Sequence, residues 1–364
     1  MTAMDRSDKL AAALEERGLD ALLVTNLVNV RWLTGFTGSN GLALVGPGDQ
    51  RLFLTDFRYL TQSGEQVDGG WKREIAPEIL QAATAFVGGD GEAVRLGFDD
   101  ATLSVKDYGS LSARVAEGVE LVPAGGAVEA LRAIKDAGEL EKIRAAAKLA
   151  DDALADVLTR GLAGRTERDV ALDLEVTMRK AGAEGPSFPP IVASGTHSAL
   201  PHAVPRDVEI PKNTLVTIDW GAQLDGYASD CTRTYATGPD LDPRDREIYE
   251  LVLKSQLESL AAVRAGAGGR EVDAVARDVI TAAGHGEHFG HGLGHGVGAE
   301  VHEGPRLSQR SDSTLEAGQV VTVEPGVYVP GAVGVRIEDL AVVTETGSEV
   351  LTHLPKDLQV IDVA

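Results

Sequence analysis

The chain has 364 residues, of which 43% are hydrophobic and 25% are charged, and this composition is typical of a folded globular protein. Its 56 Asp and Glu residues outnumber 34 Lys and Arg residues, which gives a formal net charge of −22. Such acidity argues against a protein that binds nucleic acid or an anionic membrane, so we expect neither partner. The length indicates two or three domains.

A single cysteine, Cys231, limits the covalent and metal chemistry of the chain. One thiol cannot form an intrachain disulfide or a thiolate zinc cluster, which is typical of a protein from a reducing compartment. The first ten residues contain no long apolar run of the kind found in signal peptides, and no segment approaches the roughly 18 apolar residues of a membrane helix. We therefore expect a cytoplasmic protein.

The first third of the sequence alternates short apolar runs with helical patterns. Apolar spacing predicts helices over Leu10–Leu19 and Pro77–Val87. Four short apolar runs predict strands, at Asp20–Thr25, Gly41–Val45, Arg51–Thr55 and Val94–Phe98. The composition becomes loop-like at Pro123–Gly126, so we predict an α/β domain over residues 1–124 and a second domain over residues 125–364.

The second domain begins with helical patterns and ends with strands. Apolar residues at spacings of three and four predict helices over 128–158, 166–180, 245–263 and 271–283. Hairpins are expected between these helices, and strands dominate from Gly318 to Ile361. This mixture indicates an α+β fold for residues 125–364.

All eight histidines lie between residues 197 and 353, and five of them lie between 285 and 302. Glycine occupies every second position from Gly290 to Gly298, which predicts an extended strand with His291 and His295 on one face. The glycine face would let another backbone come close. For any single histidine, a solvated loop is the alternative. A zincin site is excluded, because His302 does not begin an H-E-x-x-H motif.

A hairpin motif carries two aspartates. The dipeptide Asp225-Gly226 predicts the turn, and folding the two arms back places Asp219 and Asp230 nearly opposite each other. Directly opposed like charges destabilise a pair of strands, so we expect a cation between them. The alternative is that one aspartate caps a turn while the other faces solvent.

The same pattern recurs near the C-terminus, where the midpoint of Glu324 and Glu338 falls at residue 331, within the turn Pro330–Gly334. Two acidic hairpins and a histidine strand would supply four carboxylates and an imidazole among apolar strands, where uncompensated charge is costly. These ligands suit divalent ions such as Mn²⁺, Co²⁺ or Zn²⁺. The sequence therefore predicts a site for two metal ions.

These segments together resemble the pita-bread metallopeptidases, which include Xaa-Pro dipeptidase (prolidase), aminopeptidase P and methionine aminopeptidase. The resemblance covers essentially the whole chain and implies a creatinase-like N-terminal domain and a pita-bread catalytic domain. It is carried by Ile218-Asp-Trp-Gly-Ala222, Ser229-Asp-Cys-Thr-Arg233, Gly290-His-Gly-Leu-Gly-His-Gly-Val-Gly298, Val301-His-Glu303, Val323-Glu-Pro-Gly326 and Val335-Arg-Ile-Glu-Asp339.

The resemblance also implies a set of metal ligands. These would be Asp219, Asp230, His295, Glu324 and Glu338. Asp230 and Glu338 would bridge two ions, and Glu324 would also accept a proton from the attacking water. Cys231 follows a ligand but is expected to be a small buried side chain rather than a nucleophile.

Four further residues receive roles from the same resemblance. His202 and His302 would lie beside the scissile carbonyl, where they would donate to the developing oxyanion. His291 and Arg336 would shape the substrate pocket. For His202, packing in a turn between two prolines is an equally good alternative.

The segment Asn29–Gly41 resembles the N-terminal domain of the prolidase and aminopeptidase P branch, and it lacks the glycine spacing of a phosphate-binding loop. The expected activity is hydrolysis of Xaa-Pro dipeptides, and aminopeptidase P activity on longer peptides is the close alternative. A creatinase-like hydrolase and a non-catalytic binding module are less favoured, because all five ligand positions are filled. Manganese is the first choice of metal, with cobalt or zinc as alternatives, and a homodimer is expected by analogy alone.

Overall fold

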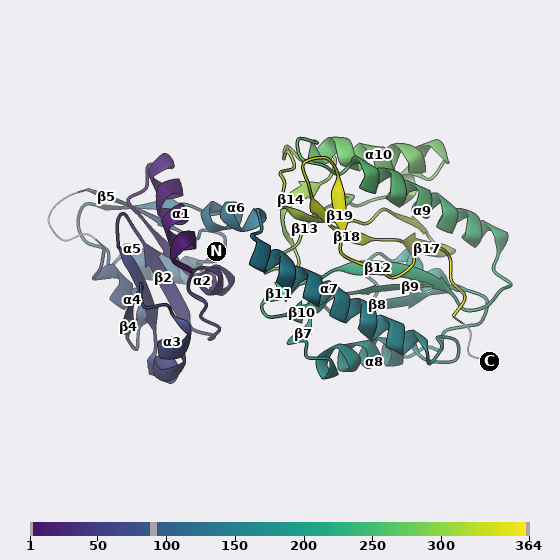
Figure 1. Cartoon of the computed structure of the whole chain (residues 1–364), viewed down its shortest axis with the longest axis horizontal. Helices are drawn as coiled ribbons and strands as arrows, with labels where there is room; N and C mark the ends of the chain where they lie inside the picture. The colour runs from purple at the N-terminus through teal and green to yellow at the C-terminus, as the bar shows by residue number, and fades with distance from the viewer. Residues whose placement is uncertain (1–2, 88–92, 362–364) are drawn as a thin grey trace. The chain divides into compact units, whose positions relative to one another are not determined.

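The computed structural model describes residues 3–87 and 93–361, and it divides the chain into two compact units, residues 1–132 and 133–364 (Figure 1). This division lies eight residues beyond the predicted boundary of 124/125. The cause is the short helix α6 (Ala127–Ala133), whose Ala127 and Val128 pack in the core of the first unit. No helix of the described ranges is both long and apolar enough to cross a membrane.

The first unit contains a six-stranded sheet in the order β4-β3-β2-β1-β5-β6. Its strands are β1 (Ala21–Val24), β2 (Gly41–Val45), β3 (Arg51–Thr55), β4 (Lys72–Ile75), β5 (Val94–Phe98) and β6 (Val119–Pro123). The β1–β2 and β2–β3 pairs are antiparallel, whereas β3–β4, β1–β5 and β5–β6 are parallel. All four predicted strands are present, but the sequence patterns missed β4 and β6, whose residues are mostly exposed or half-buried.

Both faces of this sheet are covered. Leu22 and Val24 of β1 pack in one apolar cluster, and Ala21 and Leu23 pack in another, as the alternation of a strand requires. The helices of this unit are α1 (Ala3–Glu16), α2 (Leu27–Thr34), α3 (Leu60–Gln66), α4 (Ile79–Thr84) and α5 (Val105–Ser112), with a short helical turn, η1 (Phe57–Tyr59). Helix α1 ends earlier than predicted, because the chain turns at Gly18 with φ of 63°.

The second unit opens with two helices, α7 (Ala137–Leu158) and α8 (Glu167–Lys180). A single helix was predicted over 128–158, but Asp136 interrupts it by capping α7 in a reciprocal capping box with Glu139. Helices α9 (Pro243–Ala262) and α10 (Gly269–Ala282) pack against each other later in the chain. Figure 1 shows the strands of this unit between α7–α8 on one side and α9–α10 on the other.

The strands of the second unit form curved sheets rather than one continuous sheet. The pairings are β12-β9-β8, β11-β10-β7, β14-β13-β15-β18-β19 and β16-β17. Their bounds are β7 (Gly185–Pro186), β8 (Ile191–Ser194), β9 (Leu215–Trp220), β10 (Ala222–Leu224), β11 (Tyr227–Ala228), β12 (Cys231–Ala236), β13 (Gly294–Gly296), β14 (Glu303–Leu307), β15 (Val320–Val323), β16 (Gly326–Val329), β17 (Val333–Arg336), β18 (Asp339–Val343) and β19 (Ser348–Val350). Helical turns η2 (Gly195–Ala199) and η3 (Gly286–His288) complete the unit. Two long hairpins each pass from one sheet into another. Asp230, Glu324 and Glu338 lie at these breaks, and Asp219 lies near the end of β9.

Candidate active site

The first acidic hairpin has the predicted turn but a different register. Asp225 and Gly226 have φ of 49° and 78°, as the two central residues of a type I′ turn require. The turn is therefore centred between them, one residue later than the midpoint of the two aspartates. Thr232 lies opposite Asp219, and Asp230 is a diagonal neighbour on the same face. The prediction that the aspartates lie nearly opposite each other therefore holds only to within two residues of pairing, with Asp230 diagonal to Asp219.

The second acidic hairpin has the predicted register. Val323 pairs with Asp339 in one sheet, and Gly326 pairs with Arg336 in the next. Both pairs belong to one register, so Glu324 and Glu338 occupy opposite positions in the break between the sheets. At the break, the Glu338 amide donates to the carbonyl of Thr232 in the first hairpin at 3.1 Å.

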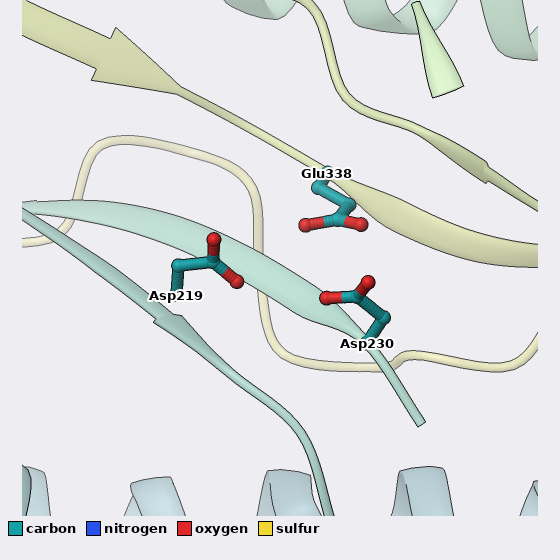
Figure 2. Close-up of side chains that lie close together, drawn as sticks. All are labelled: Asp219, Asp230 and Glu338. Carbon is teal, nitrogen blue, oxygen red and sulfur yellow. The ribbon is translucent and has the colours of Figure 1, made fainter. Parts of the chain in front are cut away.

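The two hairpins bring three carboxylates together (Figure 2). Oxygens of Asp219, Asp230 and Glu338 all lie within 4.8 Å of one another. The Nε2 atom of His295 lies 3.4 Å from Oε1 of Glu324 and 3.6 Å from Oδ2 of Asp230. All five predicted ligands therefore converge on one place.

The electrostatics of this cluster fit bound cations. Oδ1 of Asp219 and Oε1 of Glu338 are buried without a hydrogen-bond partner among the described residues. Burial, together with the neighbouring carboxylates, raises the pKa of Asp230 and Glu338 well above the usual range. Burial also raises the pKa of Glu324 to about 7. Carboxylate oxygens without donors are the ligands that divalent ions take.

His295 has the protonation state of a metal ligand. Its Nδ1 lies 3.1 Å from the carbonyl oxygen of Gly296, so Nδ1 is assigned as the N–H donor and Nε2 faces the carboxylates with a lone pair. Burial lowers the pKa of His295 to about 3, which keeps the ring neutral. A Cβ at Gly294 or Gly296 would collide with the carbonyl of Thr322 or Gly304, so the glycine face does admit neighbouring backbone.

The predicted extended strand around His295 is shorter than expected. Only Gly294–Gly296 forms β13, and the preceding residues also bond to helix α10. The Leu293 amide donates to Asp273, and Arg277 donates to the carbonyl of His291 at 2.7 Å. His291 nevertheless lines the same cavity as His295.

Arg336 links the acidic cluster to the substrate side of the cavity. Its guanidinium donates to Oδ2 of Asp219 at 2.6 Å and to the hydroxyl of Tyr328 at 2.7 Å. That hydroxyl lies 3.0 Å from Nε2 of His291. Thr232 accepts from Arg336 and donates to Glu338 at 2.7 Å. Tyr328 lies outside every sequence motif, and Thr232 lies within the motif Ser229–Arg233 but received no role from it.

The cluster lies in a cavity of about 540 Å³. Eight of the nine predicted site residues line it. The ninth, Glu338, lies beside Asp219 and Asp230. His202 and His302 are exposed, and the His302 ring packs against His295 with centroids 4.4 Å apart. An apolar wall is formed by Phe188, Pro189, Pro190, Ile191, Pro201, Ala203, Val204 and Pro205.

One positively charged residue of the cavity, Arg306, was not predicted from the sequence. Arg306 lies opposite His295 in the β13–β14 pair and lines the cavity. Its side chain forms no hydrogen bond or ion pair within the part of the chain that the structure describes. An exposed arginine on a strand is usually a solvated residue, so only the fold reveals its place.

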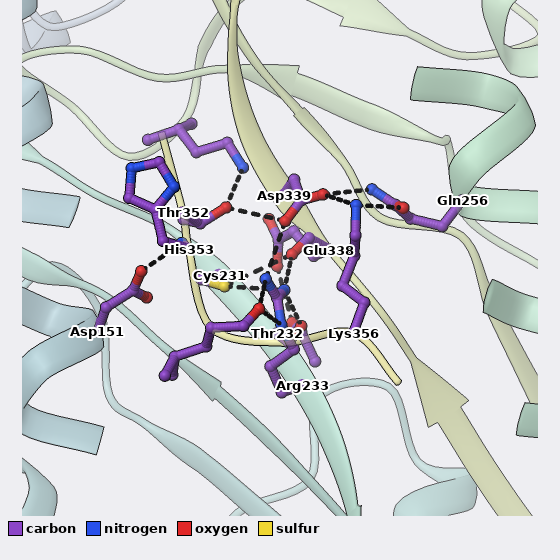
Figure 3. Close-up of polar contacts among 12 residues, drawn as sticks. Asp151, Cys231, Thr232, Arg233, Gln256, Glu338, Asp339, Thr352, His353 and Lys356 are labelled. Atoms are coloured by element: carbon purple, nitrogen blue, oxygen red, sulfur yellow. Dashed lines mark hydrogen bonds and ion pairs between the residues drawn. The ribbon is translucent and has the colours of Figure 1, made fainter. Parts of the chain in front are cut away.

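A buried polar network contacts the backbone of Glu338 (Figure 3). Arg233 donates to the Glu338 carbonyl and, at 2.9 Å, to Asp339. Asp339 also accepts from Gln256 at 2.9 Å and from Lys356. Cys231 is buried beside this network, and burial raises the pKa of its thiol, so it is a small packed side chain and not a nucleophile.

Comparison with known proteins agrees with this geometry. Residues 141–345 match metallopeptidase family M24, and residues 6–134 match the creatinase/prolidase N-terminal domain. An Xaa-Pro dipeptidase of Pyrococcus furiosus is 35% identical over 362 residues, which cover 97% of this chain and 99% of the relative.

Solved structures extend the similarity to the fold. The Xaa-Pro dipeptidase from Bacillus anthracis is 42% identical with a TM-score of 0.94, covering 99% of this chain and 100% of that one. The X-Pro aminopeptidase from Thermotoga maritima is 35% identical with a TM-score of 0.88, covering 98% and 99%. The chain therefore belongs to metallopeptidase family M24, with a creatinase/prolidase N-terminal domain and a pita-bread catalytic domain.

Proposed function

We propose that this chain is a two-metal Xaa-Pro dipeptidase. The observation that carries the proposal is the convergence of four carboxylates and one neutral imidazole on a cavity with an apolar wall. Relatives named Xaa-Pro dipeptidase, similar over nearly the whole chain, support the same activity. A creatinase-like hydrolase or a non-catalytic module would not need all five ligand positions.

Two divalent ions would be held by Asp219, Asp230, His295, Glu324 and Glu338, with Asp230 and Glu338 shared between them. Four of the five ligands offer oxygen, which favours Mn²⁺, and Co²⁺ or Zn²⁺ also suit the mixed set. When bound, such ions would polarise the scissile carbonyl and lower the pKa of water toward neutrality.

The residues of the chain supply the proton transfers and the orientation. Glu324 would accept the proton of the attacking water, and its position in the cavity lining supports this role. His202 and His302 reach the cavity from two different segments and would donate to the carbonyl oxygen as it gains charge. His291 and Arg336, joined through Tyr328, would fix the shape of the pocket between them.

The wall and Arg306 indicate the substrate. A proline ring has a fixed φ and no backbone N–H, so an apolar wall can receive it with little ordering cost. In a dipeptide the free carboxylate follows this ring directly, and Arg306 offers a cation in the same cavity. A longer peptide would place a neutral amide at that point.

The test compares Ala-Pro, Ala-Ala and Ala-Pro-Ala at saturating Mn²⁺ by release of free alanine. We expect the highest kcat/KM for Ala-Pro, and we expect Arg306→Met to reduce kcat/KM for Ala-Pro more than for Ala-Pro-Ala. Arg310→Met, a control at an exposed arginine outside the cavity lining, should change neither. Faster cleavage of Ala-Pro-Ala by the wild-type protein would favour aminopeptidase P activity instead.

We also propose that the protein is a homodimer that acts in the cytoplasm. These two proposals rest on the analogy with the family and on the single reduced cysteine. Light scattering of the purified protein would test the first, and a monomer mass would contradict it. Fractionation of the source cells would test the second.

A further inference from the structure

A carboxylate outside the cavity holds both ends of the loop that forms one cavity wall. The loop runs from Ser194 to Arg206 and is called the wall loop below. It contributes His202 and the apolar residues Pro201, Ala203, Val204 and Pro205 to the cavity lining. Glu167, the first residue of α8, is fully buried beneath it and does not line the cavity.

At the start of the wall loop, Glu167 accepts three hydrogen bonds. The amide and hydroxyl of Ser194 donate to Oε1 at 2.9 and 2.8 Å. Nδ1 of His197 lies 2.9 Å from Oε2. Three groups on the first turn of the loop are therefore fixed to one side chain.

At the end of the loop, the same carboxylate binds Arg206. The Arg206 amide and Nε lie 3.1 Å from Oε2, and Nη2 lies 3.2 Å from Oε1. The Arg206 side chain is 45% exposed, whereas that of Glu167 is fully buried. Although burial alone would raise the pKa of Glu167, its hydrogen bonds to Arg206 and Ser194 lower it below the usual value, so the group is ionised at neutral pH.

The middle of the loop has independent attachments to β17. The Gly334 amide donates to the Ser198 hydroxyl at 2.8 Å, and Arg336 donates to the carbonyl of Pro201 at 3.2 Å. A Cβ at Gly334 would collide with the Ser198 carbonyl. These contacts hold the middle of the loop over β17. Glu167 joins the two ends of the loop, and Ser194 is also held by its pairing with Val216 of β9.

We propose that Glu167 and Arg206 are positioning residues that set proline selectivity, because their ion pair joins the two ends of the wall loop. This ion pair fixes the distance between the loop ends and therefore the placement of His202 and the apolar wall over the substrate. Without the ion pair the wall would move away from the substrate, so the site would lose its preference for a rigid ring over a flexible residue. This inference rests on the proposed Xaa-Pro activity.

The test measures the ratio of kcat/KM for Ala-Pro to that for Ala-Ala in Glu167→Gln and Arg206→Met. This ratio does not depend on the fraction of folded enzyme, so a variant that is merely less stable leaves it unchanged. We expect the ratio to fall roughly tenfold in each variant, as the loss of charge-assisted hydrogen bonds implies. Arg206→Lys should restore part of it, because the cation returns without the planar fork. Bound Mn²⁺ per chain should stay at the wild-type value.

Glu175→Gln is the matched control, because Glu175 lies on the same helix and pairs with Arg179 on an exposed face. It should leave the ratio unchanged. The Arg206 side chain is partly exposed, so we expect Arg206→Met to fold. This variant therefore tests the inference even if Glu167→Gln does not fold. An unchanged ratio in Arg206→Met and in any folded Glu167→Gln protein overturns the inference. A wild-type protein that shows no preference for Ala-Pro would instead refute the proposed function.

Discussion

Replacing Glu338 by glutamine should stabilise the protein without metal and destabilise it with metal. Oxygens of the three clustered carboxylates lie within 4.8 Å of one another. Two unit charges at that distance repel by ~3.5 kcal/mol at an effective dielectric constant of about 20. Glu338→Gln removes its repulsion with both aspartates and keeps an oxygen to accept from Thr232. Because protonation already relieves part of the repulsion, we expect a gain of about 1–3 kcal/mol in the free energy of unfolding at pH 8 in EDTA.

With metal bound, the wild-type protein should be more stable than Glu338→Gln. At an ion concentration about 100 times the dissociation constant, one site stabilises the folded chain by about 2.7 kcal/mol and two sites by about 5.4 kcal/mol, which exceeds the gain of the variant in EDTA. The variant lacks one shared ligand, so most of this gain should be lost. Urea unfolding at pH 8, in EDTA and then in Mn²⁺, measures both effects. Glu349→Gln, at a half-exposed ion pair with Arg144, should change stability by no more than about 0.5 kcal/mol in either buffer. A variant that is less stable than wild type in EDTA, or one that Mn²⁺ stabilises as much as wild type, would show that Glu338 neither repels the aspartates nor binds metal.

Three further predictions concern separate parts of the site. His302→Ala should lower kcat by about 100-fold with Mn²⁺ content near normal. Lost metal with normal kcat would show that the roles of His302 and His295 had been exchanged, with His302 as the metal ligand. Glu324 has its folded pKa raised to about 7 from 4.5, so its contribution to stability is present below pH 4.5 and is lost as pH rises through 7. In EDTA, the stability of wild type relative to Glu324→Gln should fall across this window, and a constant difference would contradict the assignment. Lys356→Met should lower the urea midpoint by removing a cation from Asp339, with Lys356→Arg closer to wild type, and equal midpoints for all three proteins would show that the contact is dispensable.

The acidic hairpins show what the sequence could predict about the site. Glu324 and Glu338 could be paired from their spacing, because one regular register runs through both halves of that hairpin. The spacing of Asp219 and Asp230 gave a pairing two residues out, because the turn is centred one residue beyond their midpoint. The correct register of one hairpin and the incorrect register of the other both depend on where the turn is centred, which residue spacing alone gives only when the turn is symmetric.

Residues that reach the site only through the fold could not be predicted in this way. Arg306 faces the cavity because β13 and β14 pair, and Glu167 supports a wall loop that starts 27 residues later. Tyr328 joins Arg336 to His291 across three segments. None of these residues belongs to a local pattern, since each contact depends on how distant strands and helices pack.

The same limit applies to the fold. Strands such as β1 and β2 were predicted, because every one of their residues is buried. The edge strand β4 and the helices α3 and α5 lack a strong apolar pattern, so they were missed. The helical stretch predicted over 128–158 was divided by a cap at Asp136, a local signal that the apolar spacing concealed.

Titration of the metal-free protein with Mn²⁺, with bound ions and Ala-Pro hydrolysis followed in the same samples, tests whether the carboxylate cluster is a two-metal active site. We expect two ions per chain at saturation and no hydrolysis before metal is added. We also expect Asp230→Ala and Glu338→Ala to lose both tight binding and activity, because each removes a shared ligand. Full hydrolysis of Ala-Pro by the metal-free protein, or two tightly held ions in both variants, would contradict this expectation.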